Sequence, residues 1–401
     1  MSTSTSPVTS PAHELSFCGS RDAAGAVPAV SARSVFVDLA RAGAILMMLQ
    51  GHTLHVVLAS EARTGTAVYL WSFLRGLTSC TFLLLSGFVF TVATQRRWTD
   101  HLSSRAAIGR RFRRFGFFLL LGYVLHFPMA KIAHLYGMSA ERWQSFLIVD
   151  ILQCIAVTLA GLQVLVLLAR TPRHYTIGAA VGGAAIVALT PAMWRIDWSG
   201  QVPLAVAAYL SPSIGSLFPL FPWGAYILLG AVLGAVYVRS GRTHLTRFAN
   251  HVMLGGGAGM ATLALVGAGV PLQPFGDTDF WSTSPNQFLL RSGLVLLILG
   301  LLAHISRLLS RPPFVVQALA HESLTIYAVH LCLVYGSVWN AGLRQLVGPT
   351  LTLLPALAYV AAVWASMMVL ASAWYWCKER QPGVAQWVRV GAAGLLLGRL
   401  L

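Results

Sequence analysis

Apolar residues in this chain gather in runs of roughly 20, separated by short stretches that carry most of its arginines and prolines. A helix of that length crosses the hydrocarbon core of a bilayer. The pattern predicts an all-α fold, a polytopic membrane helix bundle with about ten transmembrane helices. The candidate helices lie near 35–58, 68–94, 112–128, 145–169, 175–191, 217–238, 252–270, 287–306, 318–340 and 353–376.

These runs divide the chain into three parts. Residues 1–32, rich in Ser, Ala and Pro, are predicted to form a disordered cytoplasmic tail. Residues 33–376 are predicted to form the transmembrane domain, whose weakest span is the Gly/Ala-rich fifth run that ends at Pro191. Residues 377–401 are predicted to be a cytoplasmic tail that can lie on the membrane surface as a helix, because this run is short for an eleventh span.

Composition and charge favour a membrane protein over a soluble one. Hydrophobic residues make up 56% of the chain and charged residues only 10%, with a mean hydropathy of +0.70, whereas soluble domains carry about 25% charged residues. The net charge is +16, and the positive-inside rule puts most Lys and Arg on one side if both termini are cytoplasmic. We therefore predict a multi-pass protein of the cell (inner) membrane with lipid as its surroundings. Nucleic acid is excluded as a partner, since it needs a basic stripe on a water-facing element.

The first predicted helix places ionisable groups inside the membrane. Arg41 and His52 are 11 residues apart, so they share one face and lie roughly 16 Å apart along the axis. Asp38 is close to the same stripe and can pair with Arg41 at i, i+3. One helix face thus carries a cation near the cytoplasm and an imidazole near the outside. A snorkelling arginine and an interfacial histidine are the structural alternatives.

Further polar groups in later runs are predicted to lie towards the outside. Buried charge costs about 2.5–3.5 kcal/mol per group, so such residues mark function more often than loop charges do. Hydrogen bonding between helices is the alternative for each residue alone. His330, near mid-membrane, is the most costly without partners. The five cysteines show no metal spacing, and no metal is expected. The outward group comprises Arg75, His126, Asp150 and Arg291, and Gln153 lies with Asp150 in the fourth predicted helix.

Several segments resemble membrane-bound acyltransferases. The stretch from Asp38 through Arg41 to His52 is similar to the first helix of the acyltransferase-3 family, and 82–88 resembles that family's Phe-x-x-x-Ser-Gly-Phe signature. Three later segments look more like the heparan-α-glucosaminide N-acetyltransferase branch: 150–156, 218–223, which contains Trp223, and 322–330. The resemblance covers residues 33 to about 376, with five motifs in order.

The resemblance implies an enzyme that takes an acyl group, acetyl in the first instance, from cytoplasmic acyl-CoA (acetyl-CoA) to an extracytoplasmic glycan hydroxyl or amine. His52 is implied as the catalytic base and Arg41 as the contact for the donor. The remaining polar residues and Trp223 are implied as substrate-binding. In the lysosomal branch the catalytic histidine stands at a position that corresponds to the neighbourhood of Trp71 in this sequence, so the chain departs from that branch. The acyltransferase-3 pattern implies that His52 takes the role instead.

Two other functions fit the same residues. A transporter or permease would use the buried charges as a substrate path, and a membrane scaffold would use them to join helices. The sequence leaves open the acceptor, the acyl chain length, direct transfer or an acyl-histidine intermediate, and a monomer or a homodimer.

Overall fold

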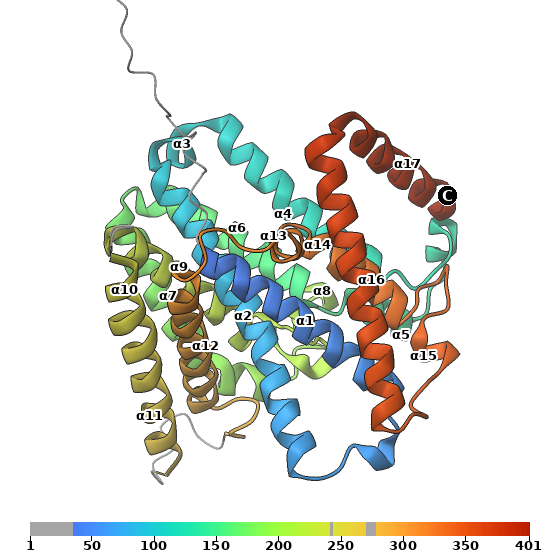
Figure 1. Cartoon of the computed structure of the whole chain (residues 1–401), viewed down its shortest axis with the longest axis horizontal. Helices are drawn as coiled ribbons and strands as arrows, with labels where there is room; N and C mark the ends of the chain where they lie inside the picture. The colour runs from blue at the N-terminus through green and yellow to red at the C-terminus, as the bar shows by residue number, and fades with distance from the viewer. Residues whose placement is uncertain (1–34, 241–243, 270–277) are drawn as a thin grey trace, which may run out of the picture. The chain divides into compact units, whose positions relative to one another are not determined.

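The computed structural model describes residues 35–240, 244–269 and 278–401, and the named elements in these ranges are all helices, which confirms the all-α class (Figure 1). The predicted tail 1–32 lies outside the described residues. The elements are α1 Val35–Val57, η1 Ser60–Ala62, α2 Thr66–Arg96, α3 Trp98–Ser103, α4 Arg105–Leu125, η2 Ile132–Leu135, α5 Ala140–Leu147, α6 Ile151–Ala169, α7 Pro172–Arg195, α8 Leu204–Leu210, η3 Pro212–Ile214, α9 Leu220–Ser240, α10 Leu245–Arg247, the π-helix η5 Phe248–Gly255, α11 Gly256–Gly269, α12 Pro285–Ser306, α13 Phe314–His321, α14 Ser323–Val334, α15 Leu343–Leu346, α16 Leu353–Arg380 and α17 Pro382–Leu400.

Within the described residues, seven helical segments are long and apolar enough to cross a membrane: α2, α6, α7, α9, the continuous stretch Leu245–Gly269, α12 and α16. Each coincides with a predicted run. Two further predicted spans, α1 and α4, are helical but are not among these seven. Helix α1 contains Asp38, Arg41 and His52, and the first half of α4 is rich in arginine. The number of helices that cross the bilayer beyond these seven stays a prediction.

Three predicted spans have wrong boundaries. The run predicted over 145–169 is divided at residues 148–150, because α5 ends at Leu147 and α6 begins at Ile151. The span predicted over 318–340 is broken: α13 ends at His321, α14 runs from Ser323 to Val334, and Glu322 between them has φ −95° and ψ 16°. The Glu322 carboxylate is 1% exposed and forms an ion pair with Lys378 of α16, so a distant partner fixes the break. The fifth span does not end at Pro191, which is buried inside α7.

Helices α2 and α9 pack most closely, because glycines let their backbones meet. A Cβ added at Gly87 would lie 1.8 Å from the Ile227 carbonyl oxygen, and one at Gly230 would lie 1.9 Å from that of Leu84. Small residues permit such close approach between membrane helices. The largest hydrophobic core forms around this crossing.

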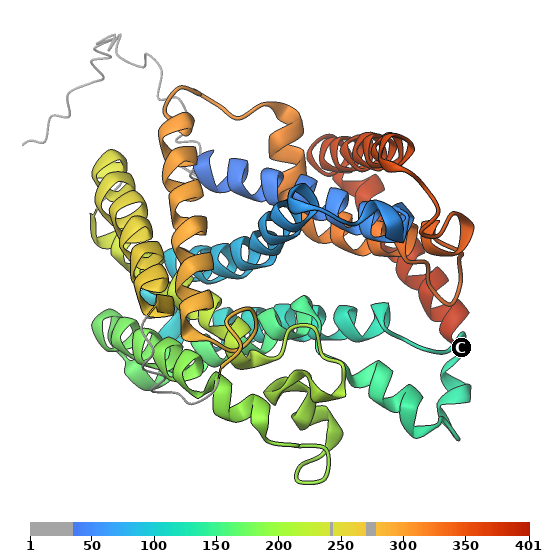
Figure 2. The ribbon, with the colours of Figure 1, turned by 90° about the horizontal axis from the view of Figure 1, so that it is seen from below.

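Helix α1 runs through the middle of the bundle, where it contacts α2, α12, α13, α14 and α16 (Figures 1 and 2). The pair α10–α11 lies at one edge, and α16 with α17 lies at the opposite edge. The end of α1 is tied to the segment before α16, because the amide of Leu351 donates to the Val57 carbonyl (2.9 Å) and the amide of Ala59 donates to the Leu351 carbonyl (2.8 Å). This segment lies between Tyr335, at the end of α14, and the start of α16.

Candidate functional site

His52 lies in the last third of α1 and is held by a tyrosine. Its Nδ1 is 2.7 Å from the Tyr335 hydroxyl, and Tyr335 directly follows α14. The Gln345 side-chain amide donates to the Tyr335 carbonyl at 2.9 Å, which fixes this turn of the chain. His52 is only partly buried. The imidazole is therefore oriented on one side and accessible on another.

His330 of α14 lies beside His52, with ring centroids 5.3 Å apart in an edge-to-face arrangement. Its side chain is fully buried, and its Nδ1 donates to the Ile326 carbonyl at 2.9 Å. That bond leaves Nε2 as an acceptor, which has no hydrogen-bond partner among the described residues. The hydrogen bond from His330 to the backbone one turn earlier therefore offsets part of the cost of burying this histidine in the membrane.

The Asp150 carboxylate joins α6 to α14 and α4. It accepts the amide of Ile151 at 2.7 Å as the N-cap of α6, and it accepts the Tyr327 hydroxyl at 3.0 Å. His126 Nε2 lies 3.6 Å from the same carboxylate. The Tyr327 ring is in turn 5.6 Å from the ring of His330. Asp150 and His52, 98 positions apart in the numbering, are therefore connected through two side chains of α14.

Gln153 is fully buried one turn into α6. A Cβ at Gly122 of α4 would lie 2.6 Å from its side-chain amide carbon, so the missing side chain of Gly122 makes room for the amide. Neither the oxygen nor the nitrogen of that amide has a hydrogen-bond partner in the part of the chain that the structure describes. Two unsatisfied polar atoms beside the Asp150 turn can serve a bound ligand.

Two predicted arginines line α2 and α12. The Arg75 guanidinium donates to the Gly51 carbonyl at 3.3 Å and stacks on Trp71, 5.1 Å from the ring centroid. It therefore lies one residue from His52 along α1. Arg291 extends to Gly76, where a Cβ would be 3.5 Å from Nη2. These cations stand on the α2 side of the histidine.

The structure does not bring every predicted residue to this cluster. Asp38 and Arg41 lie near the other end of α1, about three turns from His52, and their mutual pairing stays a prediction. Trp223 packs in an aromatic group of α9, with its ring centroid 4.8 Å from Phe218 and 5.9 Å from Tyr226. Its predicted contact with substrate is untested.

Sequence reasoning missed the two tyrosines that complete the cluster. Tyr335 lies inside the predicted span 318–340, and the hydrophobic pattern does not distinguish it from the apolar residues around it. Tyr327 precedes His330 by three positions, so a helical projection would have put both on one face. The described residues contain no group of three or more His, Cys, Asp or Glu side chains suited to a metal ion.

The arrangement has the parts for proton transfer within a membrane. If His52 Nδ1–H donates to Tyr335, its Nε2 has a lone pair for a substrate proton. The apolar helices around this site and the two neighbouring histidines together indicate a polytopic membrane protein whose site lies inside the helix bundle.

Residues 33–265 match the family described as "Heparan-alpha-glucosaminide N-acetyltransferase, catalytic", and the chain belongs to that family. The predicted resemblance to the heparan-α-glucosaminide N-acetyltransferase branch is confirmed over these residues, and membership implies a membrane enzyme of the acetyltransferase type. The match spans α1 to most of α11, whereas Arg291, His330 and Tyr335 lie beyond it. No curated protein matches the chain at a significant level.

Proposed function

We propose that the protein transfers an acyl group, acetyl in the first instance, from cytoplasmic acyl-CoA to an extracytoplasmic carbohydrate hydroxyl or amine. The observation that carries the proposal is His52: its Nδ1 is hydrogen-bonded to Tyr335, and its ring is partly exposed beside His330. Histidine suits general-base chemistry near neutral pH. Family membership supports the acetyl group and the coenzyme donor.

His52 Nε2 takes the proton from the acceptor hydroxyl or amine as that atom attacks the thioester carbonyl. The new C–O or C–N bond forms, the C–S bond breaks, and the proton passes from His52 to the departing thiolate of the coenzyme. The bond to Tyr335 stabilises the imidazolium present between these two transfers. We propose direct transfer, without acylation of the histidine.

The donor is proposed to enter from the cytoplasmic end of α1. Arg41 lies roughly 16 Å along the axis from His52, which calls for a donor with a long flexible arm, as in acyl-CoA. Arg41 and the arginines at the start of α4 supply cations for its phosphates. Asp38, one turn from Arg41, is proposed to hold that guanidinium.

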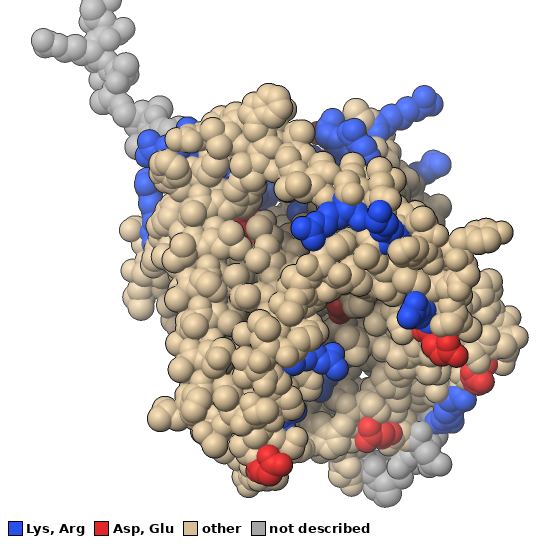
Figure 3. Space-filling model, turned by 90° about the vertical axis from the view of Figure 1, so that its right-hand side faces the viewer, with Lys and Arg blue, Asp and Glu red and all other residues tan. Residues whose placement is uncertain are grey.

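The acceptor is proposed to meet the polar groups at the outer half of the bundle. Arg75, His126, Asp150 and Gln153 supply both donors and acceptors there, which suits sugar hydroxyls. We propose about ten spans with both termini cytoplasmic. On the face drawn in Figure 3, the larger groups of Lys and Arg atoms lie in the upper half, smaller ones lie lower, and most Asp and Glu atoms lie in the lower half, a bias that supports this orientation.

The test compares His52→Ala with His55→Ala, an exposed histidine three residues later on the same helix. Membranes that hold either variant receive radiolabelled acetyl-CoA, and label is measured in envelope glycans by chromatography and mass spectrometry. We expect His52→Ala to lose about 10²–10⁴-fold in rate and His55→Ala to retain activity. Undiminished labelling by a folded His52→Ala protein would refute the mechanism. Solute uptake into proteoliposomes without acyl-CoA would favour a transporter.

A further inference from the structure

A second polar pocket lies far from His52 in the chain, where α9 ends and the next helix begins. Its volume is about 310 Å³, at the lower end of the range of small-molecule sites. Four of its lining residues carry hydrogen-bond donors on their side chains. The lining consists of Ser240, His244, Arg247, Phe248, His251 and Val252.

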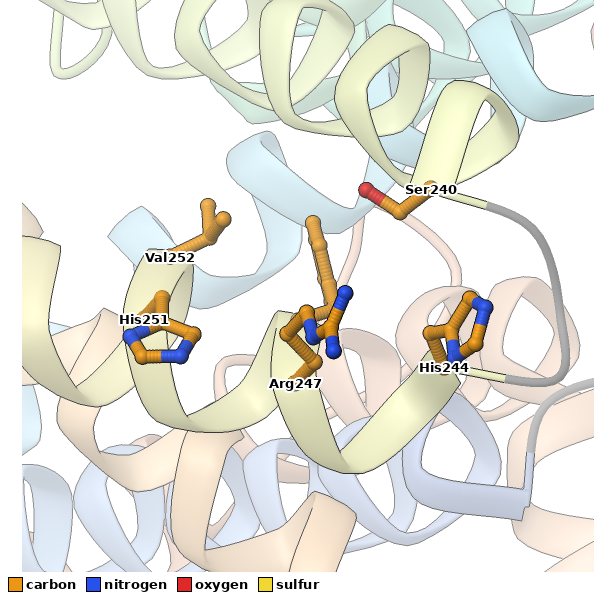
Figure 4. A pocket seen from close by; sticks show the side chains of 6 residues that line it. Ser240, His244, Arg247, His251 and Val252 are labelled. Atoms are coloured by element: carbon orange, nitrogen blue, oxygen red, sulfur yellow. The ribbon is translucent and has the colours of Figure 1, made fainter.

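The donors come from the end of α9 and from the start of the helical stretch that follows it, and they face a common space. His244, Arg247 and His251 follow one another along one side of a helix, with Ser240 at the end of α9 across from them (Figure 4). Their spacing of three and then four residues keeps them on that side. Among the described residues, no carboxylate lines the pocket. Arginine and imidazole N–H groups with a hydroxyl favour an anion with several acceptor oxygens.

The wall of the pocket is an irregular helix that is firmly packed. Residues Phe248–Gly255 form a π-helix, which carries His251 and Val252; π-helical turns are rare and frequently occur at functional sites. Phe248 is buried, with its ring centroid 5.2 Å from that of Tyr237 in α9. Asn250 is 2.7 Å from His304 Nε2 of α12. The donors of the pocket therefore stand on a backbone held from two sides.

The surroundings indicate where the anion comes from. Only 17% of the apolar window in Leu245–Gly269 is buried inside the protein, and Leu263, Leu265 and Val266 are exposed. The helix lies at the edge of the bundle in Figures 1 and 2, so lipid covers this face. In the proposed orientation the pocket opens at the level of the inner head groups, where basic pockets between helices bind phosphate-bearing lipids.

We infer that this pocket binds a phosphate ester, the head group of an inner-leaflet phospholipid. The inference uses the proposed orientation but not the proposed chemistry at His52. Arg247 supplies the charge-assisted contact, and His244, His251 and Ser240 supply further donors. A lipid seated there would join α9 to the start of α10 from the membrane side.

The experiment counts phosphatidylglycerol bound to the full-length protein by native mass spectrometry, in detergent with added lipid. We expect Arg247→Gln to bind the lipid about tenfold more weakly, the effect of losing one charged hydrogen bond, and Arg247→Lys to recover part of that loss. Arg173→Gln, an exposed arginine at the same end of the neighbouring α7, is the matched control and should leave binding unchanged.

Two further arms identify the source of the phosphate. Inorganic phosphate at millimolar concentration should displace the lipid from the wild type if a phosphate group is what the pocket recognises. Coenzyme A is titrated in parallel, and a loss of its binding in Arg247→Gln without a loss of lipid would assign the site to the coenzyme phosphates. Equal lipid and coenzyme binding by Arg247→Gln and the wild type would overturn the inference. His52→Ala should bind lipid normally, which separates this outcome from failure of the acyl-transfer mechanism.

Discussion

Gly51 gives a way to move Arg75 without changing any polar residue of the site. A Cβ at Gly51 would lie 2.5 Å from Arg75 Cδ and 2.8 Å from its Cγ, whereas ordinary contact begins at 3.4 Å. In Gly51→Ala the arginine stem therefore has to retreat by about 1 Å. Its bond to the Gly51 carbonyl, already 3.3 Å long, would be lost. The adjacent His52 keeps its bond to Tyr335.

Gly43→Ala is the matched control on the same helix. A Cβ there meets no described atom within 4 Å, and alanine gains about 0.5–1 kcal/mol over glycine in a helix. Any difference between the two variants thus comes from the contact with Arg75, since the gain in helix propensity is shared. Overpacking at Gly51 should cost about 1–3 kcal/mol in unfolding free energy.

The assay is acetyl transfer from radiolabelled acetyl-CoA, with thermal unfolding in detergent measured on the same samples. A displacement of about 1 Å at a reacting centre costs up to about 100-fold in rate. We therefore expect Gly51→Ala to fall by one to two orders of magnitude while Gly43→Ala stays at the wild-type rate. If Gly51→Ala is folded and fully active, the placement of Arg75 beside His52 has no part in the reaction.

Three further perturbations test the cluster and the bundle. Tyr335→Phe removes the 2.7 Å hydrogen bond to His52 and should lower kcat about tenfold with KM little changed in steady-state kinetics. A kcat equal to that of the wild type would argue against orientation of His52 by this hydroxyl. Lys378→Ala leaves the buried Glu322 carboxylate unpaired and should cost about 3–5 kcal/mol of stability in denaturant unfolding, with Lys378→Met/Glu322→Gln costing less. Gly87→Ala places a methyl group against the Ile227 carbonyl and should unfold at a lower temperature than the control Gly161→Ala, where a Cβ meets no described atom within 4 Å. Equal unfolding temperatures for the two variants would contradict the tight α2–α9 contact.

Hydropathy and the distribution of cations were sufficient to predict depth in the membrane, but not which helices are neighbours. The runs alone indicate the helices, and the alternation of their direction puts Arg75, His126, Asp150 and Arg291 at the same end as His52. The contact between His52 and His330 depends on how α1 and α14 pack, which no local pattern encodes. That contact had to come from the structure.

The break at Glu322 shows why the site itself was only half predicted. Neither a proline nor a glycine stands between α13 and α14, so the local sequence gives no reason for the helix to stop. The reason is the ion pair with Lys378, which is 56 positions later in the numbering. The predicted span runs unbroken to 340, whereas α14 ends at Val334, so the pattern does not indicate that Tyr335 follows the helix and contacts His52.

The polar pocket at the end of α9 was missed for a related reason. Most of its lining residues lie just before the predicted span 252–270, where the positive-inside rule expects cations whether or not a binding site is present. A π-helix has no sequence signature that the hydrophobic pattern reveals. Its effect on which side chains share a surface becomes visible only in three dimensions.

The two backbone hydrogen bonds between α1 and Leu351 have a mechanical consequence. They fasten Leu351, 16 positions after Tyr335, to the end of α1 just beyond His52. A ligand that displaced this segment would therefore loosen the end of the helix that carries His52. An acceptor that entered without displacing it would meet an imidazole already oriented by Tyr335.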